Sequence, residues 1–250
     1  MLLIANKGVR CDKMNDKNLI KKVDTFKSGP FIFSLNYDRR KLSGQLVKAK
    51  VLYTTIADIP ILPDLASRLE EELIRKSIFG TAAIEGNPLS QEAVNKVLSE
   101  EDKKGKIERA EKQIQNLRKA YKMIKRFKPL AKPLSLKEDL VKELHKIITR
   151  DCEGPENSPG VYRNHLVKVG NKEHGGVYTP PKISNDIKNL MNHFMNWINS
   201  PEVFKEDLAI RAALAHYYLA LIHPFGNGNG RMSRAIEAIL LKSAGIKFVP

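Results

Sequence analysis

The segment from His223 to Arg234 contains residue types that bind and activate phosphate groups. One histidine is followed by three glycines within five residues and then by Arg231 and Arg234. Glycines let a phosphate approach the backbone, and guanidinium groups match its oxygens in pairs. An imidazole beside a bound phosphate can act as a general base. The segment therefore predicts phosphate chemistry.

This segment must be a tight loop between two helices, because apolar residues recur at helical spacing on both sides, in residues 210–222 and 232–241. The second helix should begin near Gly228 to Arg231, with its free backbone N–H groups directed into the loop. Such a helix start is an anion site. Two arginines three positions apart share a helix face there.

The composition is that of an ordinary soluble globular protein, since 42% of the 250 residues are hydrophobic and 28% are charged. The chain can form one large domain or two small ones. No apolar run approaches the roughly 20 residues that cross a bilayer, and Met1–Ala5 is too short for a signal peptide. We expect a cytoplasmic protein without a membrane partner. Cys11 and Cys152 have neither disulfide-framework nor metal-site spacing.

The chain carries a formal net charge of +15, and the excess is concentrated in residues 101–150, which hold 16 Lys and Arg against 7 Asp and Glu. One interpretation is a generally basic surface of solvated helix faces. The other is a contact area for nucleic acid or an acidic partner. No interleaved aromatic residues offer a stacking platform for bases.

The first half of the chain changes character several times. Residues 1–30 are polar and basic and predict a loose start, and residues 31–37 predict a short strand or an extended arm. Apolar residues at helical spacing then predict a helix that ends at Glu85–Pro88, and Ser90 marks the next helix start. The spacing over 107–127 predicts a further helix.

The second half is also mainly helical. Ser135 and Glu138 predict a capping box that opens a helix through Ile147. Residues 151–181 differ, because alternation over 165–169 and a return at Val177 and Tyr178 predict a small β-hairpin. Helices should resume at 184–198 and 205–221. The pattern predicts a mostly α fold with one small hairpin.

The loop sequence from His223 to Arg231 resembles the signature of the Fic family, HPFx[D/E]GN[G/K]R, with Asn227 as its one departure. Pro159–Arg163 resembles the strand that leads into the flap of that family, and Tyr178–Pro181 resembles the exit of the flap. The similarity covers roughly residues 70–245. It implies a Fic-type helical bundle with a β-hairpin flap, divided into an N-terminal arm at 1–65 and a catalytic domain at 66–250.

A second motif, Thr81–Asn87, resembles the inhibitory pattern [S/T]xxxE[G/N] of class II Fic proteins. The resemblance implies an inhibitory helix near residues 75–87. Its glutamate, Glu85, would pair with Arg234, the arginine that otherwise binds the γ-phosphate of ATP. The same glutamate could align a water that removes AMP from a modified protein.

The resemblance implies a self-inhibited protein adenylyltransferase that transfers AMP from ATP to Ser, Thr or Tyr hydroxyls. His223 would be the base. The residues implied to bind nucleotide are Gly228, Asn229, Gly230, Arg231 and Arg234. The implied Mg²⁺ ligand is Asn227, where the family usually has an acid; its amide oxygen can coordinate a hard cation but brings no charge to attract it. Phe225 should anchor the loop in the core.

The flap residues Val177, Tyr178 and Thr179 would bind an extended target segment through main-chain hydrogen bonds. Dimers are common in the family, and self-modification is a further expectation. The alternatives are deadenylylation, transfer of another phosphate-containing group, or a degenerate module that binds nucleic acid. We interpret five other histidines as surface or packing residues: His145, His165, His174, His193 and His216. The target and the nucleotide preference stay open.

Overall fold

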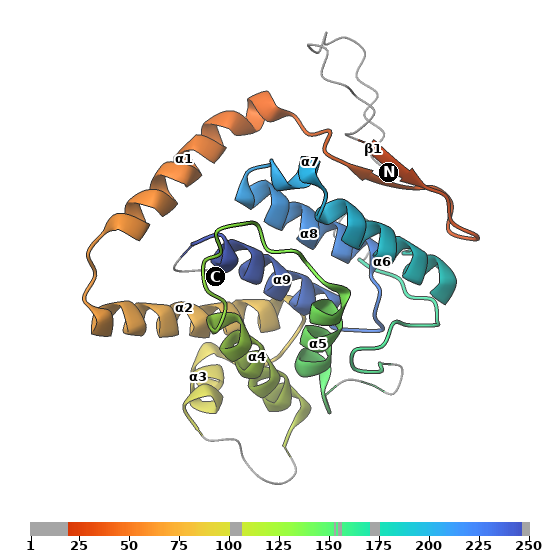
Figure 1. Cartoon of the computed structure of the whole chain (residues 1–250). Helices are drawn as coiled ribbons and strands as arrows, with labels where there is room; N and C mark the ends of the chain where they lie inside the picture. The colour runs from red at the N-terminus through yellow and green to blue at the C-terminus, as the bar shows by residue number, and fades with distance from the viewer. Residues whose placement is uncertain (1–19, 101–106, 153, 155–156, 171–175, 247–250) are drawn as a thin grey trace.

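The computed structural model describes residues 20–100, 107–152, 154, 157–170 and 176–246 (Figure 1). The helices of this part of the chain are α1 (Arg39–Asp58), α2 (Pro63–Ile84), α3 (Gln91–Ser99), α4 (Arg109–Lys125), α5 (Glu138–Thr149), α6 (Ser184–Ile198), α7 (Pro201–Phe204), α8 (Leu208–Ile222) and α9 (Asn229–Ser243). The strands are β1 (Ile20–Val23) and β2 (Phe31–Ser34). The expectation of a mostly α fold is confirmed.

Helix α9 lies in the middle of the bundle, in contact with α2, α4, α5 and α8. Its residues Met232, Ile236 and Ile239 are fully buried. Ten of its 15 residues are buried, so neighbouring helices cover it on most sides. The position of its first turn is therefore determined by several neighbouring helices at once.

The two strands pair antiparallel, with Val23 opposite Phe31. Phe33 is fully buried, and its ring centroid lies 5.5 Å from that of Trp197 in α6 and 5.0 Å from that of Tyr218 in α8. The strand expected within 31–37 is confirmed. The expectation of a loose start for residues 1–30 was wrong at β1, because the hydrogen bonds to β2 hold this segment in a strand that its own residues do not predict. Residues 1–19 lie outside the described part.

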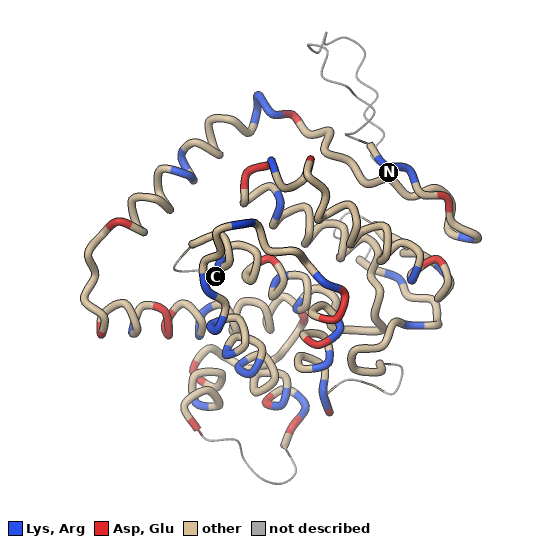
Figure 2. The backbone as a smooth tube through the Cα atoms, viewed as in Figure 1, with Lys and Arg blue, Asp and Glu red and all other residues tan. Residues whose placement is uncertain are grey.

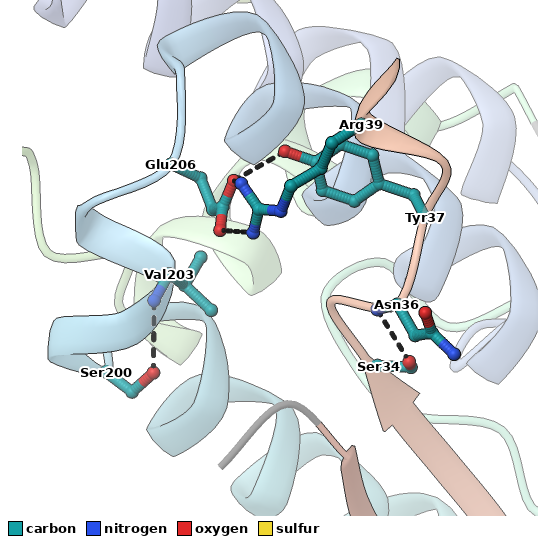
Figure 3. A network of polar contacts seen from close by, with 7 residues as sticks. All are labelled: Ser34, Asn36, Tyr37, Arg39, Ser200, Val203 and Glu206. Atoms are coloured by element: carbon teal, nitrogen blue, oxygen red, sulfur yellow. Dashed lines mark hydrogen bonds and ion pairs between the residues drawn. The ribbon is translucent and has the colours of Figure 1, made fainter. Parts of the chain in front are cut away.

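A polar network ties the segment after β2 to the segment between α7 and α8 (Figure 3). The Tyr37 hydroxyl donates to Glu206 Oε2 at 2.6 Å, and the Arg39 guanidinium binds both carboxylate oxygens of Glu206 at 2.5 and 3.1 Å. Burial, followed by the hydrogen bond to Glu206, raises the pKa of Tyr37 to about 12. The network fixes the start of α1.

Helix α1 then extends away from the bundle along its 20 residues, none of which is buried. Its N-terminus is capped by Asp38, whose side chain accepts from the backbone N–H groups of Arg40 and Lys41. After a short turn the chain enters α2, which returns to the bundle. The expected boundary between residues 65 and 66 falls inside α2.

Two expectations about helix ends were wrong. Helix α5 begins at Glu138 after Lys137, with no side-chain cap, so Ser135 opens no capping box. The helix expected at 205–221 is α8, but it begins three residues later than expected, at Leu208, with Asp207 as its N-cap. The Ser90 cap was right, since its hydroxyl accepts from the N–H of Ala93. Over the described residues, no helix is both long enough and apolar enough to cross a membrane.

Candidate active site

The loop between α8 and α9 reverses the chain through two left-handed residues. His223 has φ of 48° and ends α8, and Gly228 has φ of 74° and precedes α9. A Cβ atom at Gly228 would lie 2.5 Å from Thr149 Cγ2, so both the conformation and the space require glycine there. The loop therefore has little freedom to take another path.

The side chain of His223 is oriented by its own helix. Its Nδ1 lies 3.3 Å from the carbonyl oxygen of Ala220. Because a carbonyl can only accept, the neutral ring carries its proton on Nδ1 and leaves the lone pair of Nε2 free. Burial lowers the pKa of His223, the Ala220 carbonyl opposes this, and the charge of Arg163 adds to the lowering. The ring is thus kept neutral, as a general base must be.

Two buried side chains hold the middle of the loop. The ring of Phe225 is fully buried and stacks on His145, with centroids 3.6 Å apart and planes 6° apart. His145 Nδ1 accepts from the Gly160 N–H at 2.9 Å, and its Nε2 lies 2.8 Å from the Asn227 carbonyl. Nδ1 therefore lacks the proton, and Nε2 donates it to Asn227. His145 is a packing residue, as expected, that also fixes the loop.

The amide of Asn229 is engaged inside the loop as well. Its Oδ1 accepts from the Phe225 N–H at 3.0 Å, and its Nδ2 donates to the Phe225 carbonyl at 2.9 Å. The residue is 1% exposed. Its side chain therefore holds the first turn of α9 to the loop, a role different from the phosphate contact expected for it.

Arg163 joins the loop to both sides of the flap. It is 3% exposed, and its guanidinium donates to three carbonyl oxygens, those of His223 at 2.8 Å, His165 at 2.7 Å and Pro181 at 2.7 Å. Its backbone N–H donates to the Pro224 carbonyl at 2.9 Å. Burial lowers its pKa to about 10. Sequence reasoning named Arg163 within a motif without assigning it this role.

A carboxylate lies over the N-terminus of α9. A Cβ atom at Gly230 would overlap Glu85 Oε1, so Gly230 leaves the room that this oxygen fills. Glu85 is the C-cap of α2, and the same oxygen accepts from Arg234 at 2.6 Å. Arg234 also donates through Nε to the Thr81 hydroxyl. An anion at this position matches the free N–H groups of a helix start.

Asn227 and Arg231 lie together behind the loop. Asn227 Oδ1 accepts from the N–H of Gly228 at 2.6 Å and lies 3.3 Å from a guanidinium nitrogen of Arg231. A Mg²⁺ ligand must offer a free oxygen without a neighbouring cation. The position therefore does not fit a protein-held Mg²⁺. Among the described residues, no group of three or more His, Cys, Asp or Glu side chains could hold a metal.

In its described residues the flap contains one isolated antiparallel bridge, between Val169 and Tyr178, with hydrogen bonds of 2.8 and 2.9 Å. The tip at 171–175, including His174, lies outside the described residues. Val177 is 51% exposed and Thr179 is also exposed. The hydroxyl of Tyr178 donates to the Leu221 carbonyl at 3.2 Å, and partial burial raises its pKa. The flap thus rests on the end of α8, beside His223.

The structure brings the loop, Glu85, Arg234 and the flap residues around the N-terminus of α9. It adds His145 and Arg163, which lie far from the loop in sequence and carried no local signal of a shared site. The PGVYR segment was the nearest signal, because it named Gly160 and Arg163. Of the other histidines, His216 in α8 pairs with Glu237 in α9 at 2.7 Å.

Comparisons with known proteins identify the family of the domain and its fold. A family model described as the Fic/DOC family matches residues 135–241. The protein adenylyltransferase Fic of Aedes aegypti is 32% identical over 179 residues, which cover 71% of this chain and 34% of that protein. A protein of the same name from Culex quinquefasciatus is 31% identical over the same shares. The chain thus spans about a third of the length of these curated relatives.

Solved structures share the fold. A Fic domain-containing signaling protein from Bacteroides thetaiotaomicron superposes with a TM-score of 0.67 at 21% identity, over 80% of this chain and 73% of that one. A Fic family protein from Desulfovibrio desulfuricans gives a TM-score of 0.65 at 22% identity, over 85% of this chain and 60% of that one. Residues 135–241 of this chain form a domain of the Fic/DOC family.

Proposed function

We propose that this chain is a self-inhibited protein adenylyltransferase that transfers AMP from ATP to a Ser, Thr or Tyr hydroxyl of a target protein. The observation that carries the proposal is the carboxylate of Glu85 over Gly230, bound to Arg234. An acid held at a helix start opposite a neutral histidine supports an anion site with a base beside it. The name of the mosquito relatives supports a nucleotide as that anion.

In this proposal Nε2 of His223 takes the proton of the incoming hydroxyl. The hydroxyl oxygen bonds to the α-phosphorus, the bond from that phosphorus to the bridging oxygen breaks, and pyrophosphate leaves. The backbone N–H groups of Asn229 and Gly230 bind phosphate oxygens, Gly228 leaves room for the phosphates to approach, and Arg231 offsets the charge of the leaving group. Such fixed positive groups supply most of the catalysis in phosphate transfer. No step passes through Mg²⁺, because Asn227 does not fit it.

Inhibition follows from the shared use of Arg234. Its guanidinium binds Glu85, whose oxygen fills the space over Gly230, so a γ-phosphate and this carboxylate compete for the same cation. Removal of the carboxylate frees both the cation and the space. The backbone groups of the exposed residues Val177 and Thr179, on either side of the Tyr178 bridge, would hold the target segment by strand addition.

The test uses ATP labelled at the α-phosphate. A Glu85→Ala chain should label itself or added lysate proteins more strongly than the unchanged chain, and His223→Ala in the same background should abolish the label. Glu71→Ala is the matched control, since Glu71 is an exposed acid on α2 away from Arg234. It should behave as the unchanged chain.

Two results would overturn the proposal. One is a label on the Glu85→Ala chain no stronger than on the chain that also carries His223→Ala. The other is calorimetry that detects no ATP binding to Glu85→Ala together with salt-sensitive DNA binding, which would favour a degenerate module. UTP, GTP and CDP-choline in the same assay separate AMP transfer from transfer of other groups.

A further inference from the structure

A groove lies between the C-terminal half of α4, the segment 127–134 and α5. It encloses about 730 Å³. Its apolar lining consists of Met123, Phe127, Leu130, Leu134 and Ile147. Leu130 is 50% exposed, although a leucine of this size is usually covered when a folded chain can cover it. The groove therefore offers apolar side chains to an outside partner.

The rim of the groove is basic. Lys122, Arg126 and Lys128 line it, all three are exposed, and none forms an ion pair with another described residue. Glu143 is the acid in the lining. Figure 2 shows Lys and Arg positions along α4. These residues belong to the segment of concentrated positive charge in the sequence, which the adenylyltransferase proposal leaves without a role.

A neighbouring groove provides an internal comparison. It shares Phe127 and Lys128 with the first groove and encloses about 450 Å³ beside the start of α2. There Glu70 binds Lys242 at 2.7 Å and Lys125 at 3.1 Å. The chain thus pairs Lys125 and Lys242 with its own carboxylate and leaves the three rim cations without an ion pair to a described residue.

The basic groove is remote from the His223 loop. The N–H of Leu130 donates to the carbonyl of Ser243, which places the 127–134 segment at the C-terminal end of α9. The loop lies at the N-terminal end, and 15 residues of helix span about 20 Å. A molecule in the groove therefore lies clear of the site proposed for phosphate transfer.

We propose that this groove is a docking site for an acidic segment of a partner protein that carries large apolar side chains. The apolar floor would take the apolar anchors, and the three unpaired cations would attract and orient the carboxylates. Nucleic acid fits less well, because the floor offers one aromatic ring where base stacking needs a platform. The inference does not depend on nucleotidyl transfer.

The test measures fluorescence anisotropy with a labelled amphipathic peptide of Leu and Glu on the full chain. The peptide should bind, and the affinity should fall as salt rises. A peptide with Ser in place of Leu, a peptide with Lys in place of Glu, and labelled oligo(dT) should each bind at least about tenfold more weakly, because each lacks one of the two features.

The matched variants separate the groove from net charge. Lys122→Glu, Arg126→Glu and Lys128→Glu together should weaken peptide binding at least about tenfold. Arg40→Glu, Lys48→Glu and Lys50→Glu change the net charge equally on exposed positions of α1 and should not. Equal losses in both variants, no peptide binding, or tighter binding of oligo(dT) would each overturn the proposal. Circular dichroism checks that both variants are folded.

Discussion

Helices α1 and α9 differ sharply in how they are held. Ten of the 15 residues of α9 are buried, whereas none of the 20 residues of α1 is. Helix α1 is held by a side-chain cap and by the Glu206 network at its start, and α9 is held by packing on most sides. Local signals can place a helix, but only tertiary packing can fix its end against a loop.

This difference matters for chemistry. The start of α9 presents N–H groups that must keep their positions relative to His223 within a fraction of an ångström if they are to stabilise a transition state. The buried contacts of Phe225, Asn229 and Arg163 supply that rigidity. Four predictions test the contrast.

Phe225→Ala should have the largest effect. It removes a fully buried ring that stacks on His145 and leaves a cavity beneath the loop. We expect a loss of about 3–5 kcal/mol in the free energy of unfolding, measured by urea denaturation. A loss below about 1 kcal/mol would mean that the loop is not anchored through this ring.

Arg163→Met should come next, with a loss of about 2–4 kcal/mol, because the three carbonyl oxygens that it serves stay buried without a donor. Arg163→Lys keeps the charge and serves as the comparison. It should still lose stability, because one ammonium group cannot reach all three carbonyl oxygens that the planar guanidinium binds. Denaturation of both chains checks this. Full stability of Arg163→Lys would show that charge alone is needed.

The pH dependence of His223 should give a smaller effect. Burial lowers its pKa in the folded state below the ordinary 6.5, so the unfolded chain binds the proton more readily. Stability from this residue is therefore present above pH 6.5 and is lost as the pH falls through 6.5 toward the lowered value. The advantage of the unchanged chain over His223→Gln should shrink between pH 7.5 and 5.5 in denaturation curves.

That comparison with His223→Gln is needed because burial also lowers the pKa of His193, which would add a similar trend in both chains. A stability advantage of the unchanged chain over His223→Gln that grows toward acid pH would contradict a neutral His223 ring.

Val51→Ala in α1 should have the smallest effect, within about 0.5 kcal/mol, because the residue is 57% exposed and packs against nothing that the substitution would uncover. Thermal unfolding of this chain and of Ile239→Ala in α9 gives the direct comparison. A similar drop in Tm for Val51→Ala and Ile239→Ala would show that packing does not hold α9 more strongly than α1.

The parts of the fold that follow from short-range spacing were predictable. The loop between α8 and α9, the helix α4 and the strand β2 all carry their pattern within a few residues. Strand β1 was missed, since its order comes from pairing with β2. The flap was expected as a hairpin, but a single bridge is observed in the described residues. Alternation of apolar and polar residues predicts which side chains share a face of a strand, but it does not predict which residues pair across two strands.

The candidate site was predictable at the loop and at Glu85, where motif spacing is local. The supporting contacts were not. His145 reaches Asn227 across 82 positions, and Arg163 reaches the His223 carbonyl across 60. Asn229 has a side chain that could bind phosphate, but its amide forms hydrogen bonds to the backbone of Phe225 instead. No local pattern distinguishes these uses of the same side chain.

Under the proposed function, the carboxylate of Glu85 over Gly230 acts as a tethered ligand of the anion site. Because it is part of the chain, its effective concentration at the anion site is constant and independent of dilution. Any free anion must displace it, so the apparent dissociation constant of that anion is the intrinsic one divided by the fraction of molecules in which the carboxylate is away. The strength of one ion pair, at 2.6 Å, thereby sets a concentration threshold for the whole site.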